Sequence, residues 1–167
     1  MMKKISNSIE ATTTFFAKLS AFLVIVLSIM IVYEAINRYF FQNGSVMMQE
    51  LQWHLFDIIF LLGLSYTLQQ DKHVRVDIFY THFSNKTQAI VNIVGIIFLI
   101  LPLTIIILKT SYTFVEMSYN QNEISSDPGG LCCRYIIKAT ILFGFVLLGL
   151  QSISELYKNF LTIKGTK

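Results

Sequence analysis

The segment "TQAIVNIVGIIFLILPLTIIIL", residues 87–108, decides the fold class because it carries no charged side chain. A membrane-spanning helix needs about 20 consecutive, mostly apolar residues, and this segment is long enough to supply them. Of the 167 residues in the chain, 54% are hydrophobic and only 14% are charged, whereas soluble domains carry about 25% charged residues. The composition therefore indicates a polytopic membrane protein with a single membrane domain over residues 1–167.

Four segments have the length and hydrophobicity of membrane-spanning helices. We expect these spans at about residues 17–41, 48–68, 88–112 and 135–157. The second is the least hydrophobic because Glu50, His54 and Asp57 interrupt its first half. We retain it because an odd number of spans would not place the Lys- and Arg-rich segments on one side of the membrane. The N-terminal apolar run is too long for a signal peptide and lacks a cleavage site, which favours a retained first helix. The predicted fold class is an all-α membrane protein with four transmembrane helices.

The distribution of Lys and Arg predicts the orientation, since cytoplasmic loops are enriched in both. With the N-terminus inside, the cytoplasmic side holds Lys3, Lys4, Lys18, Lys72, Arg75, Lys86, Lys158, Lys164 and Lys167. The outer side then holds Arg38, Lys109, Arg134 and Lys138. We therefore expect both termini in the cytoplasm. The net charge of +3 is weak and no Arg-rich tract is present, so nucleic acid is not an expected partner.

The loop between the second and third spans, "DKHVRVDIFYTHFSNK" (71–86), changes its pattern halfway along. One helical face, at positions i, i+3, i+4 and i+7, collects Val76, Phe79, Tyr80 and Phe83. This stripe predicts a short amphipathic helix that lies in the membrane interface, in contact with lipid. Ser84 precedes the third span and is predicted to be its N-cap residue.

The ionisable residues of this inner loop allow two interpretations. As metal ligands, His73, Asp77 and His82 fit no standard zinc spacing, and no cysteine is nearby. We therefore expect no metal site. Instead, Arg75 and Asp77 are interpreted as groups that fasten the loop by charge-assisted hydrogen bonds, and Asp71 as the residue that caps or stops the second helix.

Ionisable residues also occur inside the first two spans, and the short turn between these spans predicts an antiparallel hairpin. Counted outward from that turn, Arg38 and Glu50 lie at similar depth, and Glu34 and His54 lie one turn further in. Groups of opposite charge at matched depth can pair, which reduces the cost of placing them in a bilayer. A proton relay or ion site is the alternative, but the positions near the outer end favour structural pairs or contacts with a partner subunit. Haem is not expected, because His54 is the only histidine in a span.

The long outer loop, residues 115–134, has a net negative charge and contains "SSDPGGL". Pro128 and Gly129 predict a type II turn, since Gly at the third position accepts a positive φ. The candidate docking residues are Glu123, Asp127, Pro128, Gly129 and Gly130. The loop either docks a partner or only connects two helices, and the residues themselves leave both readings open.

Two adjacent cysteines, Cys132 and Cys133, follow this turn. Neighbours in sequence rarely reach good disulfide geometry with each other, and they lack metal-ligand spacing. We interpret them as two small residues near the start of a helix.

Several segments together resemble one known family. These are "RYFF" at 38–41, "EL" at 50–51, "LGLSYTLQQDKHVRVDIFYTHFS" at 62–84, "ISSDPGGL" at 124–131, "IK" at 137–138 and "GFVLLGLQSISE" at 144–155. They are similar to the small membrane subunit of tripartite ATP-independent periplasmic (TRAP) transporters, the DctQ-like family, over nearly the whole chain. The most specific part is the D-x-H-V-R-V-D pattern after an aromatic-rich second span.

The resemblance implies a non-catalytic, cofactor-free subunit of the bacterial inner membrane with both termini cytoplasmic. Its partners would be a large multi-spanning permease subunit and a periplasmic substrate-binding protein, which together import organic acids, often with sodium. The small subunit would brace the large one, and the inner-loop signature Asp71, His73, Arg75 and Asp77 would hold the inner bend against it. The chain departs from the family where Cys132 replaces a usual Pro, where no Pro occurs near Ile141, and where Trp53 is the single tryptophan.

The cysteine pair and the intramembrane carboxylates suggest two other classes of function, an oxidoreductase and an exporter. A four-helix thiol–quinone oxidoreductase needs two separated cysteine pairs, and this chain has 2 cysteines in total. A small homo-oligomeric, proton-coupled exporter would use Glu34 or Glu50 as its coupling carboxylate.

Small residues would allow close helix approach either within the chain or toward a partner, and these are Gly63, Gly95, Gly144 and Gly149.

Overall fold

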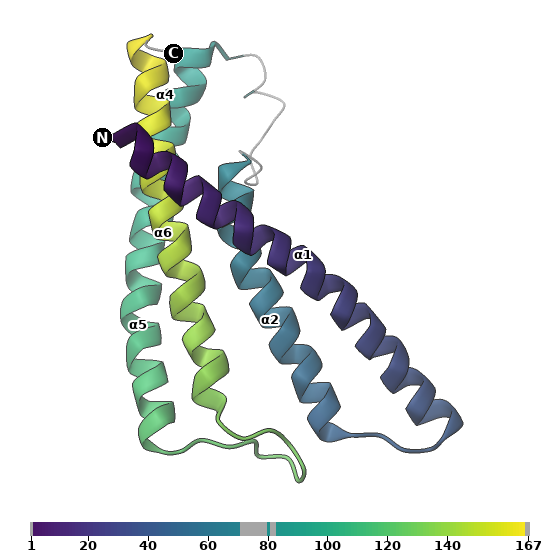
Figure 1. Cartoon of the computed structure of the whole chain (residues 1–167). Coiled ribbons are helices and arrows are strands. Elements are labelled where there is room, and N and C mark those ends of the chain that lie inside the picture. Colours follow the sequence, from purple (N-terminus) through teal and green to yellow (C-terminus); the bar gives the residue numbers. More distant parts are fainter. Residues whose placement is uncertain (1, 71–79, 81–82, 166–167) are drawn as a thin grey trace.

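The computed structural model describes residues 2–70, 80 and 83–165, and Figure 1 shows them as a bundle of long helices. In chain order the elements are α1 (Met2–Phe40), α2 (Val46–Gln69), α4 (Asn85–Gly95), η1 (Ile96–Ile100), α5 (Leu101–Asn120) and α6 (Arg134–Lys164). Because α4, η1 and α5 follow one another without a break, they act as a single span. The described residues thus contain 4 helices long and apolar enough to cross a membrane, which confirms the predicted fold class.

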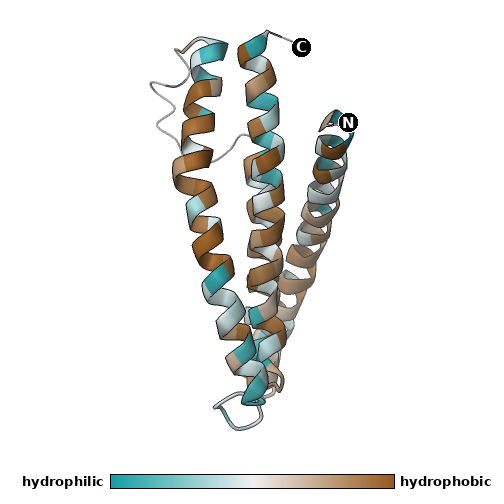
Figure 2. Ribbon diagram, turned by 90° about the vertical axis from the view of Figure 1, so that its left-hand side faces the viewer, coloured by the Kyte–Doolittle hydropathy of each residue, from teal (hydrophilic) through white to brown (hydrophobic). Residues whose placement is uncertain are grey.

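The two ends of this bundle carry different parts of the chain. The beginning of α1 and the end of α6 lie together at one end, which we call the inner end (Figure 1). The turn at 41–45 and the loop at 121–133 lie at the opposite end, which we call the outer end. Apolar residues dominate the middle of the helices and hydrophilic residues gather near their ends (Figure 2), as expected for a bilayer.

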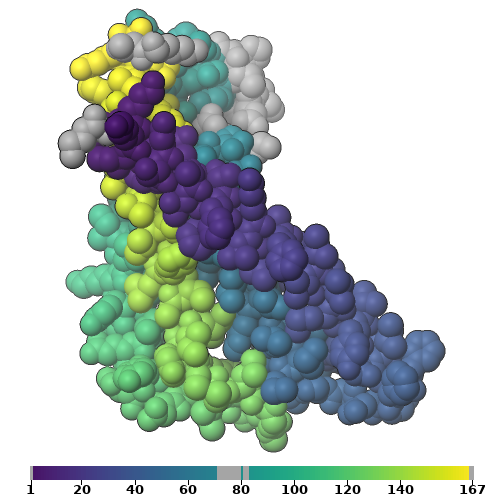
Figure 3. Space-filling model, in the orientation of Figure 1, coloured from purple at the N-terminus to yellow at the C-terminus, as the bar shows by residue number. Residues whose placement is uncertain are grey.

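The first helix is longer than the expected span at 17–41. It has 39 residues, about 58 Å at 1.5 Å per residue, whereas the hydrocarbon core of a bilayer is about 30 Å thick. The helix runs obliquely across the others, so its N-terminal part crosses α6 and its remainder follows α2 (Figures 1 and 3). Much of its surface is exposed and apolar, including Phe15, Phe22, Ile25 and Ile29.

Local sequence signals account for two of the helix starts. Ser45 caps α2, where its side chain accepts a hydrogen bond from the backbone N–H of Met48. Ser84 caps α4 and accepts from the N–H of Thr87 at 3.3 Å, which confirms its prediction as an N-cap. The predicted interfacial helix, and the cap role of Asp71, fall mainly on residues 71–79, 81 and 82, which lie outside the described residues.

The π-helical segment η1 has its cause in Pro102, which follows it closely. Proline has no N–H to donate and its ring conflicts with the carbonyl four residues earlier, here that of Phe98. The N–H of Leu101 bonds to the carbonyl of Ile96, five residues back, so the helix widens by one residue at this point. The span therefore continues through Pro102 without ending.

The core lies where α2, α6 and the α4–α5 helix meet. Its buried apolar residues are Leu61, Leu62, Leu68, Ala89, Ile96, Leu147 and Leu148. A Cβ at Gly144 would lie 2.9 Å from Leu61 Cβ and 3.1 Å from its carbonyl oxygen, so this glycine allows α6 to approach α2 closely. Gly63 and Gly95 are half-buried, and apart from their own helix no heavy atom lies within 4 Å of a Cβ built on them.

Candidate functional site

Glu50, in the first turns of α2, organises the outer end of the bundle. Its carboxylate accepts hydrogen bonds from the hydroxyl of Ser125, from the backbone N–H of Leu131 at 2.5 Å, and from Arg134 at 3.0 Å. Arg134 is the first residue of α6, and the other donors come from the long outer loop. The Glu50 side chain is 13% exposed. One carboxylate therefore holds the outer loop and the start of α6 against α2.

The outer loop contains the predicted type II turn. The N–H of Gly130 bonds to the carbonyl of Asp127 at 3.0 Å, and Gly129 has a φ of 81°, so the prediction is confirmed. A Cβ at Gly130 would overlap the side chain of Ser125 and lie 2.7 Å from a Glu50 oxygen. Glycine is therefore required at 130 to let the carboxylate reach the loop backbone.

A second ion pair closes the loop at its other side. Lys138 of α6 binds Glu123, and its ammonium also lies 3.9 Å from the centre of the Phe114 ring. The N–H of Arg134 donates to the carbonyl of Glu123 at 3.1 Å. The hydrogen bond from Lys138 lowers the pKa of Glu123 below its ordinary value. By contrast, Asp127 is exposed at the tip of the loop.

The polar residues of the first two spans do not pair as their matched depths predict, which would join Arg38 to Glu50 and Glu34 to His54. Glu34 binds Arg38 of its own helix at 2.8 Å, and across the hairpin it accepts from Gln52 at 2.6 Å. Glu50 is turned toward the outer loop and α6, so its cationic partner is Arg134 rather than Arg38. His54 lines a surface hollow beneath that loop. Depth alone misassigned the partners because the rotation of α2 about its axis decides which neighbour each side chain meets.

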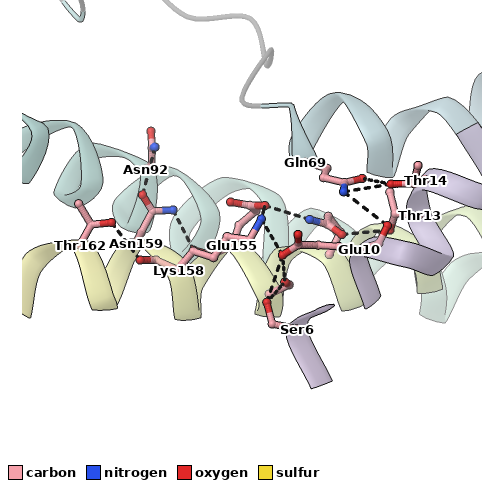
Figure 4. A network of polar contacts seen from close by, with 12 residues as sticks. Ser6, Glu10, Thr13, Thr14, Gln69, Asn92, Glu155, Lys158, Asn159 and Thr162 are labelled. Carbon is pink, nitrogen blue, oxygen red and sulfur yellow. Dashed lines mark hydrogen bonds and ion pairs between the residues drawn. The ribbon is translucent and has the colours of Figure 1, made fainter. Parts of the chain in front are cut away.

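At the inner end a polar network joins α1 to α6 (Figure 4). Ser6 is hydrogen-bonded to Ser154 at 2.6 Å, and Thr13 donates to the side-chain oxygen of Gln151 at 3.0 Å. Gln151 and Thr13 are almost fully buried. Since these are neutral groups with matched partners, they bring the two helices together without leaving a buried donor unpaired.

A charged group extends this network toward the inner surface. Lys158 of α6 lies between Glu10 of α1 and Glu155, at 2.8 Å from each. Further along, Asn159 accepts a hydrogen bond from Asn92 of α4 at 3.3 Å, and Gln69 of α2 donates to Thr14 at 3.2 Å (Figure 4). The network therefore reaches every span of the bundle.

Sequence analysis did not identify this network, although the sequence carries a signal for the close packing of the helices that form it. The buried residues of α1 are Ser6, Thr13, Ser20 and Glu34, and those of α5 are Thr104, Ser111 and Ser118. Within each helix they fall on a seven-residue repeat, which is the spacing of a helix seam. Small polar residues at that spacing indicate close helix packing in a membrane.

The remaining candidate residues are placed as follows. The inner-loop quartet Asp71, His73, Arg75 and Asp77 lies outside the described residues. Cys132 and Cys133 are free thiols with sulfurs 3.2 Å apart, next to the start of α6, and the hydrogen bond between them raises the pKa of Cys132. Among the described residues, no group of three or more His, Cys, Asp or Glu side chains has the arrangement of a metal site.

The fold and its polar clusters define a small, four-span, all-helical membrane protein with paired polar groups at both ends of the described bundle. A family model described as "Tripartite ATP-independent periplasmic transporters, DctQ component" matches residues 10–162. The chain belongs to this family and is a small membrane subunit of a TRAP transporter. The spans and the family fit a multi-pass protein of the inner membrane. No curated protein matches the sequence.

Proposed function

We propose that this chain supports the large permease subunit of its transporter as a rigid, non-catalytic brace. The observation that carries the proposal is the family match over residues 10–162, joined to the way in which both ends of the bundle are held. Glu50 holds the outer loop, and the α1–α6 network holds the inner end. A subunit fixed at both ends offers a constant surface against which a partner can move.

The surface between these ends is suited to a membrane partner. Large apolar side chains are exposed along the oblique helix α1 and along the α4–α5 span, among them Phe22, Ile29, Phe98 and Leu99. In a bilayer, such surfaces contact lipid or pack against other helices. We assign part of the exposed apolar surface of the bundle to the large permease subunit and the rest to lipid.

The orientation follows from charge. The inner end, with Lys3, Lys4, Lys158 and Lys164, is proposed to face the cytoplasm. The inner-loop signature Asp71, His73, Arg75 and Asp77 then contacts the large subunit from the cytoplasmic side. The outer loop then faces the periplasm, where a substrate-binding protein delivers organic acids for sodium-coupled uptake.

Co-purification with the large subunit tests the core of this proposal. A tagged copy of the chain, expressed with its permease subunit and extracted in mild detergent, should carry the permease with it. Reconstituted with the binding protein and an inward sodium gradient, the pair should take up organic acid, whereas either subunit alone should not. Extraction of the tagged chain without a permease, or full uptake by the permease alone, would contradict the proposal.

Two single substitutions in the outer loop test its docking role. Asp127 is exposed, so Asp127→Lys changes the surface of the loop and leaves its internal ion pairs in place. Glu123→Lys breaks the pair with Lys138 and serves as the comparison that disturbs loop structure. If the loop receives the binding protein, Asp127→Lys raises the KM of uptake for the loaded binding protein while the subunits still co-purify. Unchanged kinetics would argue against docking at this loop.

A further inference from the structure

Asp57 stands out because it is charged and exposed in the middle of a membrane-spanning helix. It lies roughly midway along α2 (Val46–Gln69), about 16 Å from the outer end of that helix at 1.5 Å per residue. Among the described residues, it has no hydrogen bond or ion pair with any other. Charged side chains at such a depth usually pair or face a protein interior.

The surroundings of Asp57 form a grooved face between the outer parts of α2 and α6. Asp57 lines one hollow of about 280 Å³ with His54, Arg134 and Lys138, and another of about 310 Å³ with Phe114 and Ile141. A third hollow on its other side reaches Leu27 and Ile31 of α1. Exposed aromatic side chains border this face, namely Trp53, Phe56 and Phe60.

The cations of the groove are already engaged. Arg134 binds Glu50, and Lys138 binds Glu123 and lies over the Phe114 ring. Asp57 thus leaves the groove with an uncompensated acidic group. Its side chain is short, so it cannot extend to the membrane surface as a lysine can. Exposed Lys109 of α5 is different, because its long side chain can reach the interface by itself.

We propose that Asp57 receives an Arg or Lys side chain from a membrane-spanning helix of the large permease subunit, which packs into the groove between α2 and α6. This inference rests on the proposed function and identifies which face of the chain meets the large subunit. Charge complementarity supports it, since the occupant must bring a cation to the middle of α2. The aromatic border supplies apolar contact around that pair, as at the centre of other helix interfaces.

A second copy of this chain is a less suitable occupant. Symmetric pairing of two copies through this face would bring the two Asp57 carboxylates toward each other, which is unfavourable. An asymmetric contact could bring Lys109 of another copy to Asp57, and this arrangement can be tested directly. Lipid with an ammonium headgroup is the other source of a cation, although its headgroup lies at the membrane surface rather than at the depth of α2's midpoint.

The test compares the isolated subunit with the complex, using Asp57→Leu and Asp57→Lys. Asp57→Leu removes an unpaired charge and should leave the isolated subunit as stable to heat as the wild type or more stable, and Asp57→Lys, which reverses the charge, should leave it folded. The same substitutions should reduce the yield of co-purified permease about ten-fold or more, because the partner's cation is left without its carboxylate. Lys109→Met, which changes another exposed charge on a span, should leave that yield unchanged.

Charge exchange makes the test specific. Changing the partner's Arg and Lys residues within its spans to Glu, one at a time, should reveal one position that restores binding of Asp57→Lys. If Asp57→Lys co-purifies as much permease as the wild type does, this inference is wrong and the supporting role still stands. If the wild-type preparation itself contains no permease, the supporting role is wrong. Two further results would overturn the inference. One is a disulfide cross-link between Asp57→Cys of one copy and Lys109→Cys of another. The other is loss of bound phosphatidylethanolamine from Asp57→Asn while the complex with the permease stays intact.

Discussion

At the outer end of the bundle a single carboxylate, Glu50, accepts hydrogen bonds from a loop side chain, a loop backbone N–H and the first residue of α6. At the inner end several separate hydrogen-bonded pairs join α1 to α6, such as Ser6 with Ser154 and Thr13 with Gln151. The outer arrangement gathers three donors on one residue, with the Lys138–Glu123 ion pair beside it, while the inner arrangement is distributed over several separate pairs. A single substitution should therefore disturb the outer end far more than the inner end.

The largest effect is expected from Glu50→Ala. It leaves Arg134, Ser125 and the N–H of Leu131 without their shared acceptor, and donors that lose a charged partner destabilise a fold strongly. We expect a fall in melting temperature of about 5 °C or more and faster proteolysis within residues 121–133. Glu116→Ala is the control, since Glu116 is exposed on α5. Equal proteolysis of the two variants would show that Glu50 does not hold the loop.

Gly144→Ala tests whether the two ends depend on the same packing between α2 and α6. The new methyl group would be forced against Leu61, and overpacking of this kind costs about 1–3 kcal/mol. Gly63→Ala is the matched control, because no atom lies within 4 Å of its added Cβ, and Ala in place of Gly in a helix adds roughly 0.5–1 kcal/mol. Thermal unfolding in detergent should shift in opposite directions for the two variants. A shift in the same direction would place the close contact elsewhere.

Thr13→Val addresses the inner end and should have a smaller effect. It leaves the buried side-chain oxygen of Gln151 without this donor, at a cost of about 1–3 kcal/mol, while the Gln151 amide nitrogen keeps its bond to Glu155 at 2.9 Å. Thr12→Val is the control, since Thr12 is exposed and its hydroxyl donates to the carbonyl of Ser8 in its own helix. Equilibrium unfolding should give Glu50→Ala a much lower free energy of unfolding than Thr13→Val. The free energy of unfolding of Thr13→Val should in turn be slightly lower than that of Thr12→Val. The reverse order would mean that the inner network is the more concentrated of the two.

The smallest effect concerns acid. The pKa of Glu123 is lowered in the folded protein, first by its hydrogen bond from Lys138. Its contribution to loop stability is therefore complete above its ordinary value of 4.5 and is lost as the pH falls through its lower folded value. Proteolysis of the outer loop with an acid-active protease should separate wild type from Glu123→Gln at pH 6, and the difference should shrink as the pH is lowered through the folded pKa of Glu123. A difference that persists in acid would contradict this role for Glu123.

Much of the local structure could be predicted because it depends on neighbouring residues. A charge-free run such as 87–108 must cross the membrane, Ser84 caps the helix that follows it, and Gly129 accepts the positive φ of its turn. The small polar residues Ser6 and Thr13 were also present as a seven-residue repeat, and this signal can be sought in advance.

The partners of the charged residues could be decided only by the tertiary structure. Glu50 meets Arg134, far along the chain, because α2 is rotated so that its first turn faces α6 and the outer loop. Depth in the membrane follows from counting residues, but the neighbour that a side chain meets depends on helix rotation and tilt. Those are set by packing, such as the contact of Gly144 with Leu61 and the oblique path of α1. The sequence by itself therefore determined the class, the four spans and the Ser84 cap, whereas the packing of tilted helices decided which polar groups pair and left the Asp57 side chain exposed.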